Sequence, residues 1–110
     1  MFTTYLQYRN SFTKTVILPY MEIKQLQEKV KQSTLLNSNP FKNPAEIMLA
    51  ITEETGEVAQ EVALLERVGT KATWQKEPSK ERLSKEISNL LNCIIGLANH
   101  YDIDIENEYR

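Results

Sequence analysis

The chain has 110 residues, of which 41% are hydrophobic and 25% are charged, and its formal net charge is −2. These values are those of one ordinary folded domain, and they exclude a strongly charged disordered chain and a two-domain protein. The acidic residues gather in the middle, because residues 44–68 hold six acids and one base whereas residues 1–43 hold six bases and two acids. An acidic centre argues against direct contact with a nucleic-acid backbone and is compatible with binding cations.

Cys93 is the single cysteine, so an intrachain disulfide is excluded. We interpret it as a small buried hydrophobic residue. The first residues lack the basic stretch and continuous apolar core of a signal peptide. No apolar run approaches the roughly 20 residues that span a bilayer. We therefore expect a cytoplasmic protein that contacts neither a membrane nor a nucleic-acid polymer.

The N-terminal residues 1–20 alternate only loosely between apolar and polar types, which fits a short strand, a poor helix or a frayed extension. Residues 20–36 are predicted to form the first helix, because Ile23, Leu26 and Val30 recur at spacings of three and four. Asn and Pro in the stretch 37–40 favour a turn that ends it.

The second helix is predicted to begin at Asn43-Pro44-Ala45-Glu46, where Asn43 serves as the cap, Pro44 suits the first turn and Glu46 completes a capping box. It is expected to run to about Val68 and to stop at Gly69. Its apolar positions follow a helical stripe that is expected to face the core. The stripe consists of Ile47, Ile51, Val58, Val62 and Leu65.

A loop over residues 69–78 is predicted to lead into a third helix, which follows Ser79 and runs to about Tyr101. A short helical segment is expected near residues 102–106. The third helix also has an apolar stripe that is expected to face the core. This stripe consists of Leu83, Ile87, Leu90, Leu91, Ile94, Leu97 and Ala98.

Two acids of the second helix lie at or beside its core-facing stripe. Glu54 falls between Ile51 and Val58, and Glu57 is three residues on, so the two carboxylates are neighbours on the helix surface. Such a pair is costly to bury without a partner, and the like charges repel. A divalent cation compensates both effects, although paired glutamates are also common on solvated helix faces.

Glu86 and Asn89 repeat this spacing on the third helix. If the two helices pack antiparallel across a short connection, both pairs converge on one place. Ligand sets made only of oxygen suit Mg²⁺ or Mn²⁺ better than zinc or copper. We therefore predict a magnesium site between the second and third helices.

The pattern Glu53-Glu54-x-x-Glu57, a spacer, then Glu86-x-x-Asn89 resembles the signature of the MazG-like nucleotide pyrophosphohydrolases, part of the all-α NTP pyrophosphatase superfamily. The resemblance covers roughly residues 21–106 and implies an all-α fold, a helical bundle of four helices completed by oligomerisation as a homodimer or homotetramer. Residues 21–110 are then a MazG-like helical domain, and residues 1–20 are an extension outside it.

The resemblance implies that Glu54, Glu57, Glu86 and Asn89 are the ligands of Mg²⁺, with Mn²⁺ as an alternative. Glu53 matches the first acid of the motif, which orients the attacking water or a second metal ion. The family has Asp where this chain has Asn89, an amide that offers one carbonyl oxygen and no charge. This departure weakens the predicted affinity for metal.

The implied activity is hydrolysis of a nucleoside triphosphate between its α- and β-phosphates, which releases a nucleoside monophosphate and pyrophosphate. Basic and aromatic residues near the second connection are candidates for contacting the substrate. They are Lys71, Trp74, Lys76, Arg82 and Lys85. The alternatives are a degenerate homologue that binds nucleotides without turnover, a helical interaction module without metal, and a relative specialised for another nucleotide.

Overall fold

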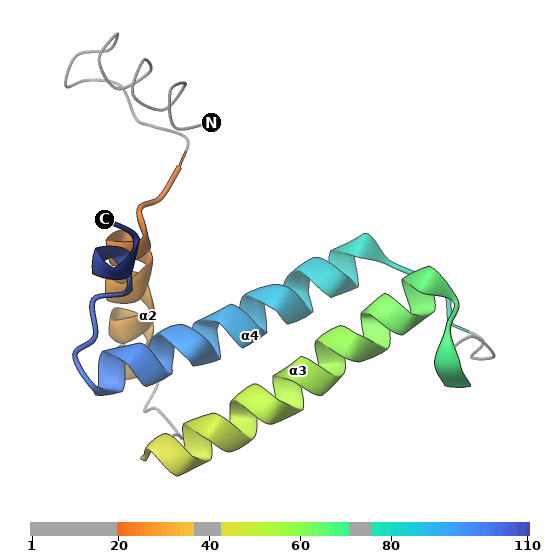
Figure 1. Cartoon of the computed structure of the whole chain (residues 1–110), viewed down its shortest axis with the longest axis horizontal. Coiled ribbons are helices and arrows are strands. Elements are labelled where there is room, and N and C mark those ends of the chain that lie inside the picture. Colours follow the sequence, from red (N-terminus) through yellow and green to blue (C-terminus); the bar gives the residue numbers. More distant parts are fainter. Residues whose placement is uncertain (1–19, 37–42, 71–75) are drawn as a thin grey trace, which may run out of the picture.

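The computed structural model describes residues 20–36, 43–70 and 76–110, and these residues are helical with no strand among them (Figure 1). The all-α prediction is therefore confirmed for this part of the chain. The elements are α2 (Ile23–Leu36), α3 (Pro44–Glu66), α4 (Lys80–His100) and the 3-10 helix η2 (Ile105–Tyr109). The predicted extension, apart from Tyr20, lies outside the described residues.

The start of α3 follows the predicted chemistry. The Asn43 side chain accepts a hydrogen bond from the Glu46 backbone N–H at 3.0 Å, and its amide donates to the Glu46 carboxylate at 2.7 Å. These two bonds satisfy one of the orphan donors at the helix N-terminus and fix the direction of entry. The expected cap is confirmed, and Glu46 contacts the cap through the Asn43 side-chain amide.

The end of α3 comes earlier than expected. The helix stops at Glu66 because Arg67 adopts a left-handed conformation, with φ of 54°, and its N–H bonds back to the carbonyls of Ala63 and Leu64. Gly69 also has a positive φ, 64°, but lies after the cap rather than at it. A left-handed arginine is unusual, and no residue type signals it in the sequence.

The next helix, α4, begins at a serine cap, where Ser79 Oγ accepts a hydrogen bond from the Arg82 N–H at 3.1 Å. Near the other end of α4, the buried side chain of Gln27 connects α2, α4 and the segment before η2 by hydrogen bonds. Its amide donates to Asn99 Oδ1 at 3.0 Å and to the Ile103 carbonyl at 2.8 Å, and accepts from the Ile105 N–H at 3.1 Å. These bonds anchor α2 and η2 to the end of α4.

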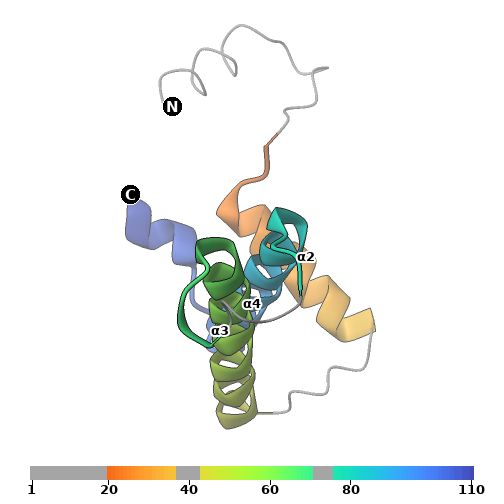
Figure 2. The ribbon, with the colours of Figure 1, turned by 90° about the vertical axis from the view of Figure 1, so that its right-hand side faces the viewer.

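In space, α3 and α4 form a long antiparallel pair, and α4 lies between α3 and α2 (Figure 2). Four apolar side chains of the described residues are buried in these contacts, namely Ile47, Leu64, Ile95 and Ala98. None of these helices is long and apolar enough to cross a membrane.

The predicted core stripe of α4 is only partly correct. Ile87, Leu91 and Ile94 remain 48%, 43% and 42% exposed. Helix α3 packs along one side of α4, whereas α2 joins α4 near Asn99 (Figure 1). Val62 of the α3 stripe is likewise 41% exposed. The periodicity identified the apolar side of each helix but not whether this chain covers it.

Candidate metal centre

Glu54 of α3 and Glu86 of α4 meet at the seam between the two helices. Burial raises the pKa of the Glu54 carboxyl above its ordinary value of 4.5, and the negative charge of Glu86 raises it further. A side-chain hydrogen bond with Glu86 also raises this pKa, and two carboxylates share such a bond only when one is protonated. The structure thus brings together the two acids that sequence spacing placed on separate helices.

One oxygen of Glu54 has no partner. Its Oε2 is buried and makes no hydrogen bond with any described residue. Leaving a buried carboxylate oxygen unpaired costs roughly 1–3 kcal/mol, and more when the group is charged. A cation at this point compensates the lost hydration and the repulsion from Glu86 together, so the donor chemistry of the pair fits a hard divalent ion.

The other predicted site residues lie on the same two helices as this pair. The charges of Glu53 and Glu57 also raise the pKa of Glu54, after the effects of burial and of Glu86. Glu57 and Asn89 are partly buried, each one helical turn beyond its neighbour in the pair, whereas Glu53 is exposed. As placed, no three acidic, histidine or cysteine side chains of the described residues form a group that could hold a metal ion.

A cleft of about 760 Å³ opens beside this seam, between α2, α4 and the start of α3. Cys93 connects the two features, because it lines the cleft and the charge of Glu54, after burial, raises the pKa of its thiol. The cleft combines apolar walls such as Leu26 and Val30 with polar groups such as Asn92. Its chemistry suits a ligand with both an apolar ring and hydrogen-bonding groups.

Within the described part of the chain, the basic residues near the connection between α3 and α4 divide into those that pair with other residues and those that do not. Arg82 donates from Nε to Glu61 Oε1 at 3.0 Å and from a terminal nitrogen to the Glu77 carbonyl, while Lys76 Nζ lies 3.9 Å from Glu61 Oε2. Arg82 is therefore engaged in joining α4 to α3. Lys85 is exposed one turn further along α4. Lys71 and Trp74 lie outside the described residues.

Sequence reasoning missed the structural importance of Glu61. Its side chain is only 7% exposed, and it pairs with Arg82 of α4 at 3.0 Å. The signal was its spacing, since Glu61 follows Glu54 by seven residues and so lies on the same face of α3. A single sequence does not say which of several acids on one face meets an arginine.

In comparisons with known proteins, no family model, no curated protein and no solved structure matches this chain.

Proposed function

We propose that this protein is a Mg²⁺-dependent nucleoside triphosphate pyrophosphohydrolase, which cleaves the α–β phosphoanhydride and releases a nucleoside monophosphate and pyrophosphate. The observation that carries the proposal is the contact between Glu54 and Glu86 at the seam of α3 and α4, with one Glu54 oxygen buried and unpaired. Holding two carboxylates this close in a helix pair costs free energy unless a cation neutralises their charge.

In this proposal Glu54, Glu57, Glu86 and Asn89 hold Mg²⁺, and Mn²⁺ can replace it. When bound, the ion neutralises phosphate charge and makes a water more acidic. Glu53 is exposed beside the pair, where it can orient that water and accept its proton. Lys85, one residue before Glu86 and exposed, is proposed to contact an outer phosphate.

The nucleoside part of the substrate is proposed to enter the cleft that Cys93 links to the acid pair. Apolar side chains there can cover a base, and Asn92 can donate to or accept from its edge. Asn99 is less available, because its amide is already bonded to the backbone and side chain of Gln27. We further propose that residues 21–110 act as one MazG-like domain and that copies of the chain assemble as a homodimer or homotetramer.

A panel of NTPs and dNTPs assayed for pyrophosphate release with Mg²⁺ tests the activity. We expect Glu54→Gln to lose at least about 100-fold in rate, the scale for losing a ligand that organises the reacting groups. Glu66→Gln is the matched control, because it removes an exposed carboxylate at the end of the same helix. Equal rates for the wild type and Glu54→Gln contradict the proposal.

One specific observation, the amide side chain at position 89, supports a second candidate function. With Asn89 the site offers one negative charge fewer than a four-acid set, so a protein that binds nucleotides without turnover is the alternative. Asn89→Asp separates the two cases. Pyrophosphate release by the wild type supports the enzyme, whereas nucleotide binding without release by either protein supports the binding homologue.

A further inference from the structure

Gly96 lies inside α4 at a position where the described packing does not require a glycine. It is not at the end of the helix, which runs to His100, and it does not have the positive φ that Gly69 has. A Cβ built at Gly96 would meet no atom of another described segment within 4 Å. Since glycine inside a helix is destabilising relative to alanine, Gly96 carries a cost that contacts within the described residues do not explain.

The neighbours of Gly96 on the surface of α4 all belong to one cleft. Residues three and four positions away from a helical residue are its neighbours on the helix surface. For Gly96 these are Asn92, Cys93, Asn99 and His100, and each of them lines the cleft of about 760 Å³, as Gly96 itself does. Gly96 therefore lies at the centre of the wall that α4 contributes, and there it leaves the helix backbone open to the cleft.

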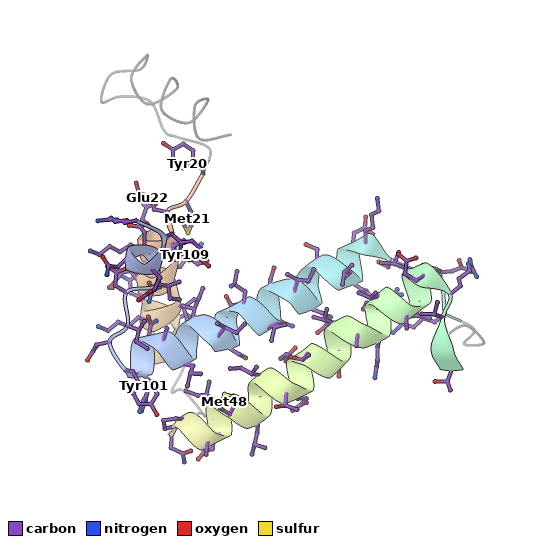
Figure 3. All side chains as sticks on the ribbon, in the orientation of Figure 1. Tyr20, Met21, Glu22, Met48, Tyr101 and Tyr109 are labelled. Atoms are coloured by element: carbon purple, nitrogen blue, oxygen red, sulfur yellow. The ribbon has the colours of Figure 1, made fainter. Side chains whose placement is uncertain are left out.

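Helix α2 supplies an apolar wall to the same cleft. Leu26 and Val30 are four residues apart, so they share one side of α2, and both line the cleft. Met21, labelled just before α2 in Figure 3, adds another apolar side chain. The peptide groups of a helix are already hydrogen-bonded, so a flat ring can cover them at Gly96 without leaving them unpaired. A cleft with one apolar wall and one bare stretch of backbone therefore suits a planar ligand.

The side chains around Gly96 place hydrogen-bonding groups at the edge of this bare position. Asn92 offers one acceptor and two donors, and the His100 ring can donate or accept. Both residues are exposed and line the cleft. Asn99 has less freedom, because its amide already bonds to the side chain and the backbone of Gln27 at 3.0 Å. A planar ring with polar atoms on its rim, which describes a nucleobase, matches this arrangement.

We propose that Gly96 is a specificity-determining residue, on which the base of the substrate lies flat against the α4 backbone and opposite the wall formed by Leu26 and Val30. Any side chain at position 96 would occupy the place of the ring, because a ring in contact with the backbone stays only about 3.5–4.0 Å from it. The identity of the ring as a base rests on the proposed function. The place of the ring follows from the cleft and from the missing Cβ.

The proposal gives Gly96→Ala two effects of opposite sign, because the methyl group favours the helix and obstructs the ligand. Urea unfolding measures the first effect. Gly56→Ala is the matched control, since Gly56 is also inside a helix and also has no described atom within 4 Å of a built Cβ, but lies outside the cleft. We expect both substitutions to raise the equilibrium constant for folding by about 2- to 5-fold.

Ligand binding measures the second effect. The ligands are the Mg²⁺ complexes of α,β-methylene nucleotides with each of the common bases, which cannot be hydrolysed at the α–β position. We expect Gly96→Ala to raise the Kd of the tightest-binding nucleotide at least about 10-fold, the scale for one added carbon in a fitted pocket, and Gly56→Ala to leave it unchanged. Inorganic tripolyphosphate, which has no ring, is expected to bind all three proteins equally.

The outcomes separate failure of this placement from failure of the proposed function. Nucleotide binding that is equal in the wild type and Gly96→Ala, or that weakens together with tripolyphosphate binding, overturns the placement of the base and leaves pyrophosphate release to be judged separately. A Gly96→Ala protein less stable than the wild type also overturns it, because packing would then require the glycine. A wild type that binds none of the nucleotides overturns the placement and the proposed function together.

Discussion

Glu54 of α3 and Glu86 of α4 contact each other across the helix seam, and the charge of Glu86 is, after burial, the largest influence that raises the pKa of the Glu54 carboxyl. Each acid occupies a helix position that periodicity alone predicts to be near the core. The contact thus places electrostatic repulsion within the longest helix pair among the described residues, and a shared proton or a bound cation would relieve it.

The first prediction concerns stability and pH in the absence of divalent metal. The folded-state pKa of Glu54 lies above the unfolded value near 4.5, so between the two values the folded protein holds a proton that the unfolded chain has lost. The free energy of unfolding therefore falls as pH rises through this window. Glu54→Gln, which cannot ionise, is expected to be more stable than the wild type by about 1 kcal/mol at pH 8.

Urea unfolding in EDTA at pH 4, 6 and 8 measures this effect. The advantage of Glu54→Gln is expected to shrink towards pH 4, because the wild-type carboxyl is increasingly protonated there. Glu66→Gln, an exposed acid of the same helix, serves as control and should show no comparable trend. A stability difference between Glu54→Gln and the wild type that does not vary with pH contradicts a raised pKa at Glu54.

The second prediction concerns metal-linked stability. A ligand that binds only the folded state stabilises it by RT ln(1 + [L]/Kd), which is about 1.4 kcal/mol at tenfold excess over Kd. Mg²⁺ is expected to raise the midpoint of thermal unfolding of the wild type but not that of Glu86→Gln. Asn89→Asp adds one negative charge and is expected to tighten Mg²⁺ binding roughly 10-fold.

Calorimetric titration of the three proteins with Mg²⁺ and Mn²⁺ checks these expectations directly. Binding by Glu86→Gln as tight as by the wild type would show that the ion lies elsewhere. A wild type that takes up neither ion, with Asn89→Asp equally inert, would remove the metal site altogether.

Much of this fold was predictable because its determinants are local. Asn43 and Glu46 indicate the start of α3, and Ser79 indicates the start of α4. In each case a hydrogen bond from a backbone N–H to a side chain three residues away forms the cap. The convergence of Glu54 with Glu86 also followed from spacing, given two antiparallel helices. The end of α3 was not predictable, because arginine has no intrinsic preference for the left-handed conformation that Arg67 adopts.

Contacts between residues that are far apart in the sequence were the main feature that could not be predicted. Gln27 bonds to groups 72 to 78 residues away, and nothing in the sequence around it marks it as buried. Ile87 and Leu91 were expected in the core, since a helical stripe records which side is apolar but not what covers it.

The third prediction concerns the ion pair between Arg82 and Glu61. The Glu61 side chain is 7% exposed, so removing its closest partner among the described residues leaves a nearly buried carboxylate whose remaining cationic neighbour there is Lys76 at 3.9 Å. Arg82→Met keeps the length of the side chain and removes its charge. We expect a loss of about 2 kcal/mol in the free energy of unfolding, less than for a fully buried pair because Arg82 itself is 36% exposed.

A double-mutant cycle with Glu61→Leu tests whether the loss arises from the unpaired charge. The double variant is expected to be more stable than Arg82→Met alone, because no carboxylate then remains buried. Arg110→Met is the control, since Arg110 pairs with Glu106 at the exposed C-terminus and its loss should cost under about 0.5 kcal/mol. Additive effects of the Arg82 and Glu61 substitutions would contradict this account.

The last prediction concerns Gln27, whose side chain joins α2, α4 and the segment before η2. Gln27→Leu conserves much of the volume but leaves the Ile105 N–H and the Ile103 carbonyl without their partner. We expect a loss of about 2 kcal/mol, the scale for orphaning buried polar groups. The loss should be local at first, since α2 contacts α4 and η2 rather than the length of α3.

Hydrogen exchange distinguishes a local from a global effect. In Gln27→Leu the amides of Ile105 and of α2 are expected to exchange at least about 10-fold faster, while those in the middle of α3 keep more of their protection. Gln25→Leu provides the control, because the Gln25 side chain accepts from the N–H of nearby Glu22 in an exposed contact. Uniformly faster exchange along all the helices would instead mean that Gln27 stabilises the fold as a whole, because opening the α2 end would then unfold the α3–α4 pair with it.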